Sequence, residues 1–496
     1  MIRWLRPQEE LTPNDQQTGL RMLLLDGMFS QIMGSLTGGA FLIAYALLLG
    51  ASNKVVGLIA AIAPLSQILQ IPSIFLVDKT QHRKSLTVIS AFISRLFWLG
   101  AAALPFIAPA PYRLPLFVVS LSLYFSVSSI TNCSFNSWMR DVIPDDVIGR
   151  FLAKRMGLAT ATALGIGLIA AFGIDFYKAR YPNEIYAYSI IFLIGLFFGL
   201  IGVGCLARIP EPKMAAVPHR NMVSVLVEPF RDTNYRSLLF FLGAWNFAVN
   251  LSAPFFTVYM LRRLELTMTI VLALSILSQV MTLLFIRLWG RLADRFSNKS
   301  VLTVSGPIFM ISVFLWPFTM MPETHALTLP LLVLIHALAG ISTAGVMLCS
   351  RGIALKTAPR GRATAYLATN ALISGSAAIL APLLAGLAAD GLATQEITVT
   401  LRWISNMVGH REFHLTAMHL RGLDFLFVFS FIFGLYAIHR LFAVEEVGEE
   451  KEDAVLIQFY TEIRNVIRHG SNIPGLRHLT YFPYAFLREM VNRKSR

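Results

Sequence analysis

Long apolar segments alternate with short polar turns along nearly the whole chain. A helix of about 20 residues crosses a bilayer, and each apolar segment reaches or approaches that length. The sequence therefore predicts an all-α polytopic membrane protein, with 12 transmembrane helices in two groups of six. The expected spans are 22–49, 55–77, 86–107, 114–138, 156–176, 185–206, 238–261, 266–289, 301–321, 327–349, 363–389 and 423–442.

Composition supports this interpretation and excludes other classes. Hydrophobic residues make up 55% of the chain and charged residues only 14%, whereas soluble proteins average about 25% charged residues. The formal charge of +14 resides largely in short loops, which is typical of membrane topology, so we expect no nucleic-acid partner. The three cysteines lie in or at the end of apolar spans, and we expect neither a disulfide framework nor a metal site nor a cofactor.

The polar stretches divide the chain into five parts. We expect a cytoplasmic segment at 1–20, six-helix bundles at 21–207 and 237–443, a linker at 208–236 rich in charge and proline, and a cytoplasmic tail at 444–496 with an amphipathic helix. A long loop precedes the last span. An N-terminus in the cytoplasm places most basic loops inside, which favours an orientation with both termini cytoplasmic. We expect the membrane to be a bacterial-type inner or plasma membrane.

A charged decapeptide, residues 290–299, separates the eighth and ninth spans. It resembles the loop signature of the major facilitator superfamily, Gly-x-x-x-Asp-Arg-x-Gly-Arg-Lys, with Gly290, Asp294, Arg295 and Lys299 in place. Ser297 replaces the second glycine of the signature, and an asparagine replaces a usual base. The resemblance implies two six-helix bundles that expose a central site alternately to each side of the membrane.

The two halves repeat each other. Asp78-Lys79 ends the second span as Asp294-Arg295 ends the eighth, and a proline loop closing with Gly-Arg follows both the fourth and the tenth span. Such a parallel repeat is typical of transporters whose halves rock about a central site. The resemblance implies a cytoplasmic gate, whereas the alternative is that these charges only fix topology. The candidate gate residues are Asp78, Arg83, Arg140, Arg150, Arg155, Gly290, Asp294, Arg295, Lys299 and Arg362.

Asp26 interrupts the apolar opening of the first span. An ionisable group there is costly unless it faces a partner or a wet cavity, and the first span lines the cavity in the resembling family. We therefore predict Asp26 as the coupling residue, with H⁺ favoured over sodium as the coupling ion. The alternative is a solvated or capping charge near the helix end.

The resemblance implies that the first, fourth, seventh and tenth spans line the central pathway, so polar and aromatic residues on these spans are candidates for a substrate cavity. Asparagines four residues apart share one helical face in both the fourth and the seventh span. The alternative is hydrogen bonding between helices. The candidates are Gln31, Tyr124, Asn132, Asn136, Trp245, Asn246, Asn250 and His336. Arg95, inside the third span, is interpreted as a structural residue, with a pair to Asp26 as the alternative.

The pattern as a whole favours a monomeric secondary active transporter of a small molecule, coupled to protons and embedded in a lipid bilayer. The chain lacks a nucleotide-binding loop, so we do not expect ATP to be the energy source. It also lacks the clustered acids that an enzyme acting on a lipid would need, so we expect no catalytic residue. An integral-membrane enzyme acting on a lipid, and a sensor with the same fold, are the alternatives. The cavity residues are compatible with a lipophilic cation, a sugar-like solute or a lysolipid, and the direction of transport stays open.

Overall fold

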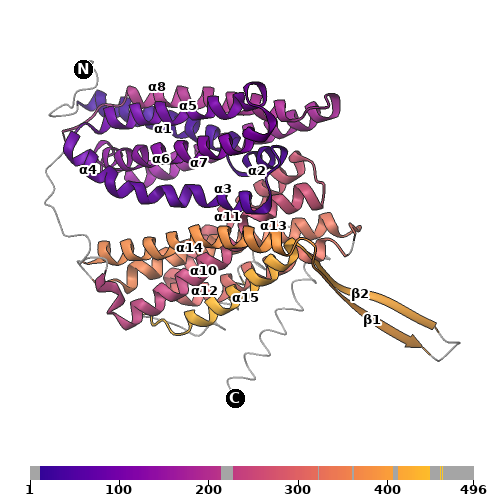
Figure 1. Ribbon diagram of the computed structural model, residues 1–496. Helices are drawn as coiled ribbons and strands as arrows, with labels where there is room; N and C mark the ends of the chain where they lie inside the picture. The colour runs from indigo at the N-terminus through magenta and orange to yellow at the C-terminus, as the bar shows by residue number, and fades with distance from the viewer. Residues whose placement is uncertain are drawn as a thin grey trace, which may run out of the picture. The chain divides into compact units, whose positions relative to one another are not determined.

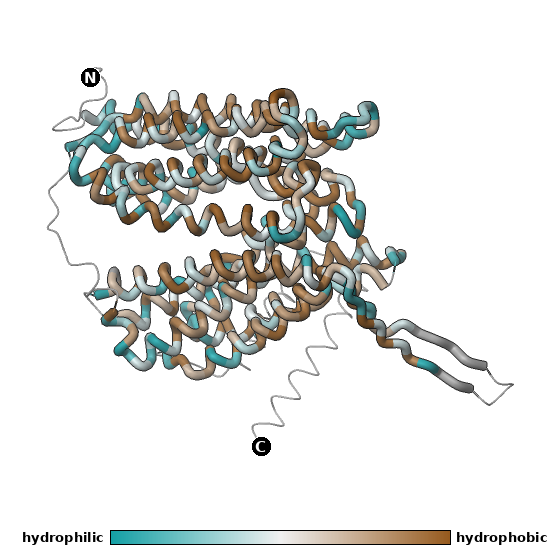
Figure 2. The backbone as a smooth tube through the Cα atoms, viewed as in Figure 1, coloured by the Kyte–Doolittle hydropathy of each residue, from teal (hydrophilic) through white to brown (hydrophobic). Residues whose placement is uncertain are grey.

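The computed structural model describes residues 12–213, 227–321, 323–359, 362–405, 411–446, 458–459 and 461. Within these residues, eleven helical segments are long and apolar enough to span a bilayer, and α12 (Asn298–Phe314) is a shorter apolar helix. Figure 1 shows these helices, and Figure 2 shows that apolar residues run along them while polar residues gather near their ends. The predicted all-α architecture of apolar spans is confirmed.

The chain divides into two compact units. Unit 1 comprises Met1–Arg220, Ser252–Ala273 and Ala378–Thr394, and unit 2 comprises Asn221–Leu251, Leu274–Ala377 and Gln395–Arg496. Unit 1 thus combines the first half of the chain with two short segments of the second half.

The helices of unit 1 pack along one another over most of their length. Helix α5 packs along α6 and α8, and α1 packs along α7 and α8. Leu23, Trp138 and Leu206 belong to a buried core at this packing. The elements are α1 (Pro13–Thr37), α2 (Gly39–Leu48), α3 (Asn53–Ser66), η2 (Gln67–Leu69), α4 (Gln70–Thr80), α5 (Arg83–Ile107), α6 (Ala110–Val142), α7 (Ile148–Arg180) and α8 (Ile185–Ala207).

The first predicted span is broken into two helices, α1 and α2. Gly38 is extended, with φ −124° and ψ −167°, and Gly39 adopts a positive φ of 52°. Glycine enters this left-handed region without the steric cost that a Cβ atom brings. The glycine pair therefore allows the backbone to leave the helix and restart it inside one membrane span.

Unit 2 contains most of the second half. Helix α12 packs along α13 and α15, and Trp289, Leu302 and Ile353 belong to its buried core. The elements of the second half are η3 (Glu228–Phe230), α10 (Thr233–Val258), η4 (Tyr259–Arg263), α11 (Met268–Arg295), α12, η5 (Trp316–Thr319), α13 (Thr328–Thr357), α14 (Ala363–Gly391) and α15 (Leu423–Leu441).

The long loop before the last span contains two strands, which the sequence analysis did not predict. Strands β1 (Glu396–Ser405) and β2 (Arg411–Arg421) pair antiparallel there, with an irregularity between Val399 and Thr400, and Figure 1 shows them as a hairpin. Alternating β-branched and polar residues from Ile397 to Thr400 favour a strand. The predicted amphipathic tail helix lies outside the described residues, except for 458, 459 and 461.

Candidate substrate cavity and gates

A polar cavity of about 410 Å³ lies inside unit 1. Its wall combines charged groups, hydroxyls and amides with a few aromatic rings, and it draws on most of the helices of the first half. The lining residues are Asp26, Ser30, Met33, Ala63, Gln67, Ala91, Ser94, Arg95, Tyr124, Phe125, Ser128, Thr131, Asn132, Phe135, Asn136, Arg155 and Leu206. Its volume falls in the range of about 300 to 1,000 Å³ that small-molecule sites occupy.

Asp26 of α1 is the acid of this wall, and it is 3% exposed. Its Oδ1 accepts a hydrogen bond from Ser30 Oγ at 2.9 Å, and its Oδ2 forms an ion pair with Arg155 Nη2 at 3.2 Å. Arg155 Nε also donates to the Leu23 carbonyl at 3.0 Å. Arg155 therefore joins α7 to α1 through both the carboxylate and the backbone, within the cavity rather than in a peripheral loop.

Arg95 of α5 is the second base of the cavity, although the sequence favoured a structural role for it. Its Nη2 donates to Ser30 Oγ at 2.9 Å, whereas Nη1 is buried and has no hydrogen-bond partner in the described part of the chain. The structure gives no ion pair between Arg95 and Asp26 there. Ser30, a neutral hydroxyl, thus stands between the two charged groups.

Two glycines make room for these side chains. A Cβ atom at Gly27 of α1 would lie 2.7 Å from Arg155 Nε, and one at Gly202 of α8 would lie 3.1 Å from Ser30 Oγ and 3.3 Å from Asp26 Oδ1. The first contact is shorter than nonbonded atoms tolerate. The absence of a side chain at these two positions therefore leaves space for the charged cluster.

The predicted cavity residues separate into two groups. Tyr124, Asn132 and Asn136 line the cavity of unit 1 together with Asp26. Gln31 is exposed on α1 and does not line that cavity. The residues predicted on the seventh and tenth spans, described next, belong to unit 2.

In unit 2 the predicted residues bond mainly to neighbouring helices and backbone. Asn246 Nδ2 donates to the Leu242 carbonyl at 2.8 Å and to Ser374 Oγ at 3.2 Å, and Asn250 Nδ2 donates to the Asn246 carbonyl at 2.8 Å. His336 Nδ1 lies 2.9 Å from Ser278 Oγ. Trp245 is 5% exposed and belongs to the buried core. The contacts of Asn246 with Ser374 and of His336 with Ser278 join helices without any charged group, whereas the two bonds to carbonyls lie within α10.

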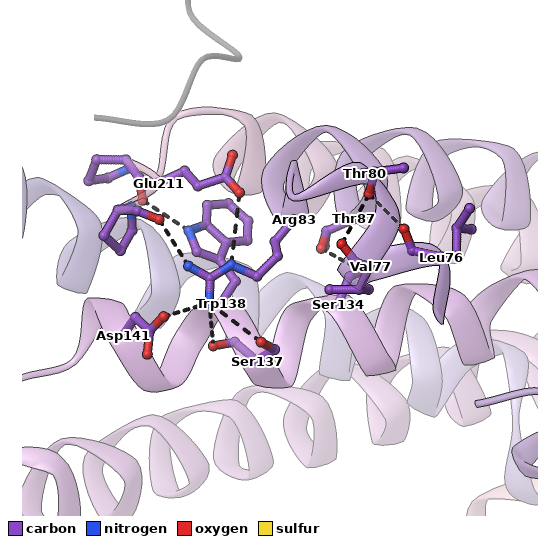
Figure 3. Close-up of polar contacts among 12 residues, drawn as sticks. Leu76, Val77, Thr80, Arg83, Thr87, Ser134, Ser137, Trp138, Asp141 and Glu211 are labelled. Carbon is purple, nitrogen blue, oxygen red and sulfur yellow. Dashed lines mark hydrogen bonds and ion pairs between the residues drawn. The ribbon is translucent and has the colours of Figure 1, made fainter. Parts of the chain in front are cut away.

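The first motif loop is held by a buried arginine rather than by Asp78. Arg83 is 1% exposed, and it donates to Asp141 Oδ2 at 2.5 Å, to the Ser137 carbonyl at 3.1 Å and to the Pro212 carbonyl at 2.9 Å. Figure 3 shows this network beside Trp138 and Glu211. Gln81, where the family has a glycine, adopts the left-handed φ of 52°. The loop thus keeps a glycine-like backbone without the glycine.

Glu211 lies next to this network at the start of α5. Its Oε1 is 3.9 Å from Arg83 Nε, and its carboxylate faces the backbone amides of Arg83 and Lys84 without forming a hydrogen bond of normal geometry. Burial raises the pKa of Glu211, and these amides and the Arg83 guanidinium oppose that rise.

The second motif loop is anchored by Glu446, which the sequence did not single out. Glu446 accepts hydrogen bonds from Asn298 N at 3.2 Å, Asn298 Nδ2 at 2.7 Å and Lys299 N at 2.7 Å. Ser297 caps α12 by accepting from Ser300 N at 3.0 Å. The two departures from the family signature therefore have structural roles, because Ser297 caps the helix and Asn298 binds the glutamate.

The other predicted gate residues are exposed or half-buried at the surface of their units. Arg140 pairs with Asp145 at 2.7 Å between exposed side chains, Arg362 pairs with Glu228, and Arg150 is exposed. The Cζ atom of Arg295 lies 5.3 Å from the centroid of the adjacent Phe296 ring. A Cβ atom added at Gly290 would lie 3.6 Å from Leu348 Cδ2, which is an ordinary contact.

Neither signature aspartate has an ionic partner in the part of the chain that the structure describes. Among the described residues, the ion pairs do not include Asp78 or Asp294. Asp294 is exposed and Asp78 is half-buried. The role of both aspartates as residues of a cytoplasmic gate stays a prediction.

Two further aspartates cap helices within unit 1. Asp175, near the end of α7, accepts from Met268 N at 3.0 Å and Thr269 N at 2.8 Å at the start of α11. Asp390, near the end of α14, accepts from Asn53 N at 3.1 Å and Lys54 N at 3.2 Å at the start of α3. The fifth span thus caps the eighth as the eleventh caps the second. In the sequence, Asp175 and Asp390 are visible only as acids near the ends of spans. The helix starts that they bind are far away in the chain and could not be predicted from this position.

Comparison with known proteins assigns the family. The model of the Major Facilitator Superfamily matches residues 23–382. The chain belongs to the Major Facilitator Superfamily. Its decapeptide loop and its repeated half are therefore features of a known membrane transporter family, as the sequence predicted.

Solved structures of several transporters share the fold of this chain at low sequence identity. A mutant of the nucleoside transporter NupG superposes with a TM-score of 0.64 at 13% identity, covering 86% of this chain and 99% of that one. A D-xylose-proton symporter gives 0.61 at 13% identity, with 88% and 99% covered. A bacterial homologue of the iron transporter ferroportin, in an inward-facing state, gives 0.58 at 12% identity, with 87% and 99% covered. The search of curated proteins finds no match.

Proposed function

We propose that this superfamily member is a secondary active transporter that moves a small molecule by alternating access and couples its movement to protons at Asp26. The observation that carries the proposal is a buried carboxylate in the wall of a polar cavity between membrane spans. Such a group is costly in a membrane unless it serves a pathway or a partner.

The ion pair between Asp26 and Arg155 supplies a mechanism for coupling. A proton on Asp26 removes the charge that holds Arg155 Nη2 at 3.2 Å. Because Arg155 also binds the Leu23 carbonyl, a change at the carboxylate alters the contact between α7 and α1. Protonation can thus shift the relative stability of two arrangements of these helices.

The two helix caps of unit 1 supply a gate. Asp175 and Asp390 each bind two backbone amides at a helix start, where the helix dipole adds a favourable interaction with a carboxylate. Arg262 Nη2 also donates to the Ala51 carbonyl at 3.0 Å, and a Cβ atom at Gly57 would lie 2.2 Å from the Pro382 carbonyl oxygen. Opening a path at this end requires that these contacts separate.

The transport proposal is tested with purified full-length protein in proteoliposomes. An internal pH dye reports proton movement when members of a solute panel are added, with and without an imposed proton gradient. We expect at least one solute to move protons and to accumulate with the gradient. A folded protein that gives no flux with any solute or gradient contradicts the proposal and favours the sensor.

The gate is tested by labelling a single cysteine at position 63, in the cavity wall, after replacement of the native cysteines. Asp175→Asn and Asp390→Asn should each raise the labelling rate from the side of the α3 start, because each cap contributes about 1 kcal/mol, or roughly fivefold. Glu323→Gln, at an exposed acid, is the matched control. Unchanged labelling in both cap variants contradicts the gate.

A further inference from the structure

The charged groups of the cavity do not balance. Its wall contains two guanidinium groups, Arg95 and Arg155, and a single carboxylate, Asp26. With all three ionised, the wall carries a formal charge of +1. A buried charge without a counter-ion is strongly unfavourable, so this excess positive charge calls for an anion.

The excess resides at Arg95. Arg155 already uses Nη2 for Asp26 and Nε for the Leu23 carbonyl. Arg95 is 8% exposed, and it has one hydrogen bond to a neutral hydroxyl, at Ser30, and an unpaired Nη1. A guanidinium carries five N–H donors in a planar fork that suits a carboxylate. Arg95 therefore has both the charge and the donors for an incoming anionic group.

The rest of the wall fits a small organic molecule around that charge. Ser94 lies one residue before Arg95, and Ser128, Asn132 and Asn136 offer hydroxyl and amide groups on α6. The ring of Tyr124 packs edge-on against Trp98, with centroids 5.4 Å apart. A lipophilic cation, compatible with the sequence, would add positive charge to a wall that already has an excess of it.

We propose that the transported solute is a small organic anion whose carboxylate binds Arg95, next to the Asp26–Arg155 pair. This inference rests on the proposed transport function and names its substrate class. Anion binding removes positive charge from beside Asp26, and a proton on Asp26 removes negative charge from beside the anion. Each event therefore favours the other, as linkage requires. One anion carried with one proton leaves the wall at its original charge of +1.

The test measures binding to the purified full-length protein without requiring transport. Thermal unfolding is followed at matched millimolar concentrations of formate and formamide, and of acetate and acetamide. Each pair differs in charge at nearly the same size, and all four are small enough to enter a site for any carboxylate. We expect the carboxylates to stabilise the protein and the amides not to.

Variants of Arg95 test whether the stabilisation by carboxylates depends on this side chain. Arg95→Gln should weaken the apparent affinity for acetate about tenfold or more, because it removes a charge-assisted interaction. Arg95→Lys, which keeps the charge, should retain part of the affinity. Arg113→Gln is the control, since Arg113 binds only the Ala108 and Pro105 carbonyls in the described chain and lies outside the cavity wall.

Each outcome decides between the proposals. Carboxylates that stabilise wild type no better than their amides overturn the anion site, and so does an effect that persists fully in Arg95→Gln. If Arg95→Gln does not fold, the comparison of carboxylates with amides on wild type decides alone. Anion binding without any flux in proteoliposomes contradicts the transport function only, whereas flux of neutral or cationic solutes without anion binding contradicts the anion site only.

Discussion

The residues predicted for the substrate cavity have different surroundings in the two units of this protein. Unit 1 contains an ionic cluster of Asp26, Arg95 and Arg155 around a cavity. Among the described residues predicted for the cavity in unit 2, Asn246 meets Ser374 and His336 meets Ser278, which are uncharged contacts. Among the residues that line the cavity of unit 1 are groups that can respond to protons or anions, whereas the residues predicted for the cavity in unit 2 make uncharged contacts.

What the units share is the support of the motif loops. A glutamate that follows the sixth span, Glu211, faces the start of α5, and a glutamate that follows the twelfth, Glu446, binds the start of α12. Both helices are the third of their half. In both halves a glutamate thus lies at the start of the third helix, whereas the polar residues predicted for the cavity differ between the halves.

The largest effect is expected from Asp26→Asn. This variant removes the acid from the cavity of unit 1, so that its lining, like the predicted cavity residues of unit 2, contains no carboxylate. We expect accumulation driven by a proton gradient to be lost and solute exchange to remain, because asparagine cannot carry the proton. Uptake and counterflow in proteoliposomes measure the two activities. Accumulation at the wild-type level would remove Asp26 from the mechanism.

A smaller effect is expected from Glu446→Gln, which tests the shared support in unit 2. Its carboxylate is 2% exposed and lies 3.5 Å from Lys356 Nζ as well as beside the amides of α12. Loss of the charge should lower the free energy of unfolding by about 2 kcal/mol. Chemical denaturation measures this, with the exposed neighbour Glu445 as a matched control in Glu445→Gln. Equal stability of the two variants would contradict the role of Glu446.

The corresponding position in unit 1 should give a pH effect. Burial raises the pKa of Glu211 above its ordinary value of 4.5, so the folded protein holds this proton more tightly than the unfolded chain. Its contribution to stability is greatest below that ordinary value and is lost as pH rises through the raised pKa. Thermal unfolding across this range should therefore depend less on pH in Glu211→Gln. An identical pH profile would show that Glu211 is not perturbed.

The smallest effect is expected from Asn246→Ala in unit 2. The variant loses the hydrogen bond to Ser374, and such bonds between membrane helices contribute about 0.6 kcal/mol on average. We expect a slight loss of thermal stability with solute affinity unchanged. A large loss of affinity at normal stability would place Asn246 at the substrate and weaken the contrast between the units.

Several features could be predicted from sequence because they depend on local order alone. Apolar segments of bilayer length predicted the spans, and Asp294 and Lys299 at fixed spacing indicated the family. The break at Gly38 and the hairpin from Glu396 were missed, although each has a local signal, because a glycine pair and a short alternating run are weak evidence beside a long apolar pattern.

The sequence by itself thus determined a duplicated set of membrane helices and marked Asp26 as a costly charge inside one of them. Only the tertiary structure decided which groups meet that charge. Arg155 was expected at a gate and lies in the cavity, Arg95 proved to have an unpaired donor, and Gln31 does not line the cavity. The physical reason is that hydropathy depends on each residue alone, whereas an ion pair depends on distances between helices far apart in the chain.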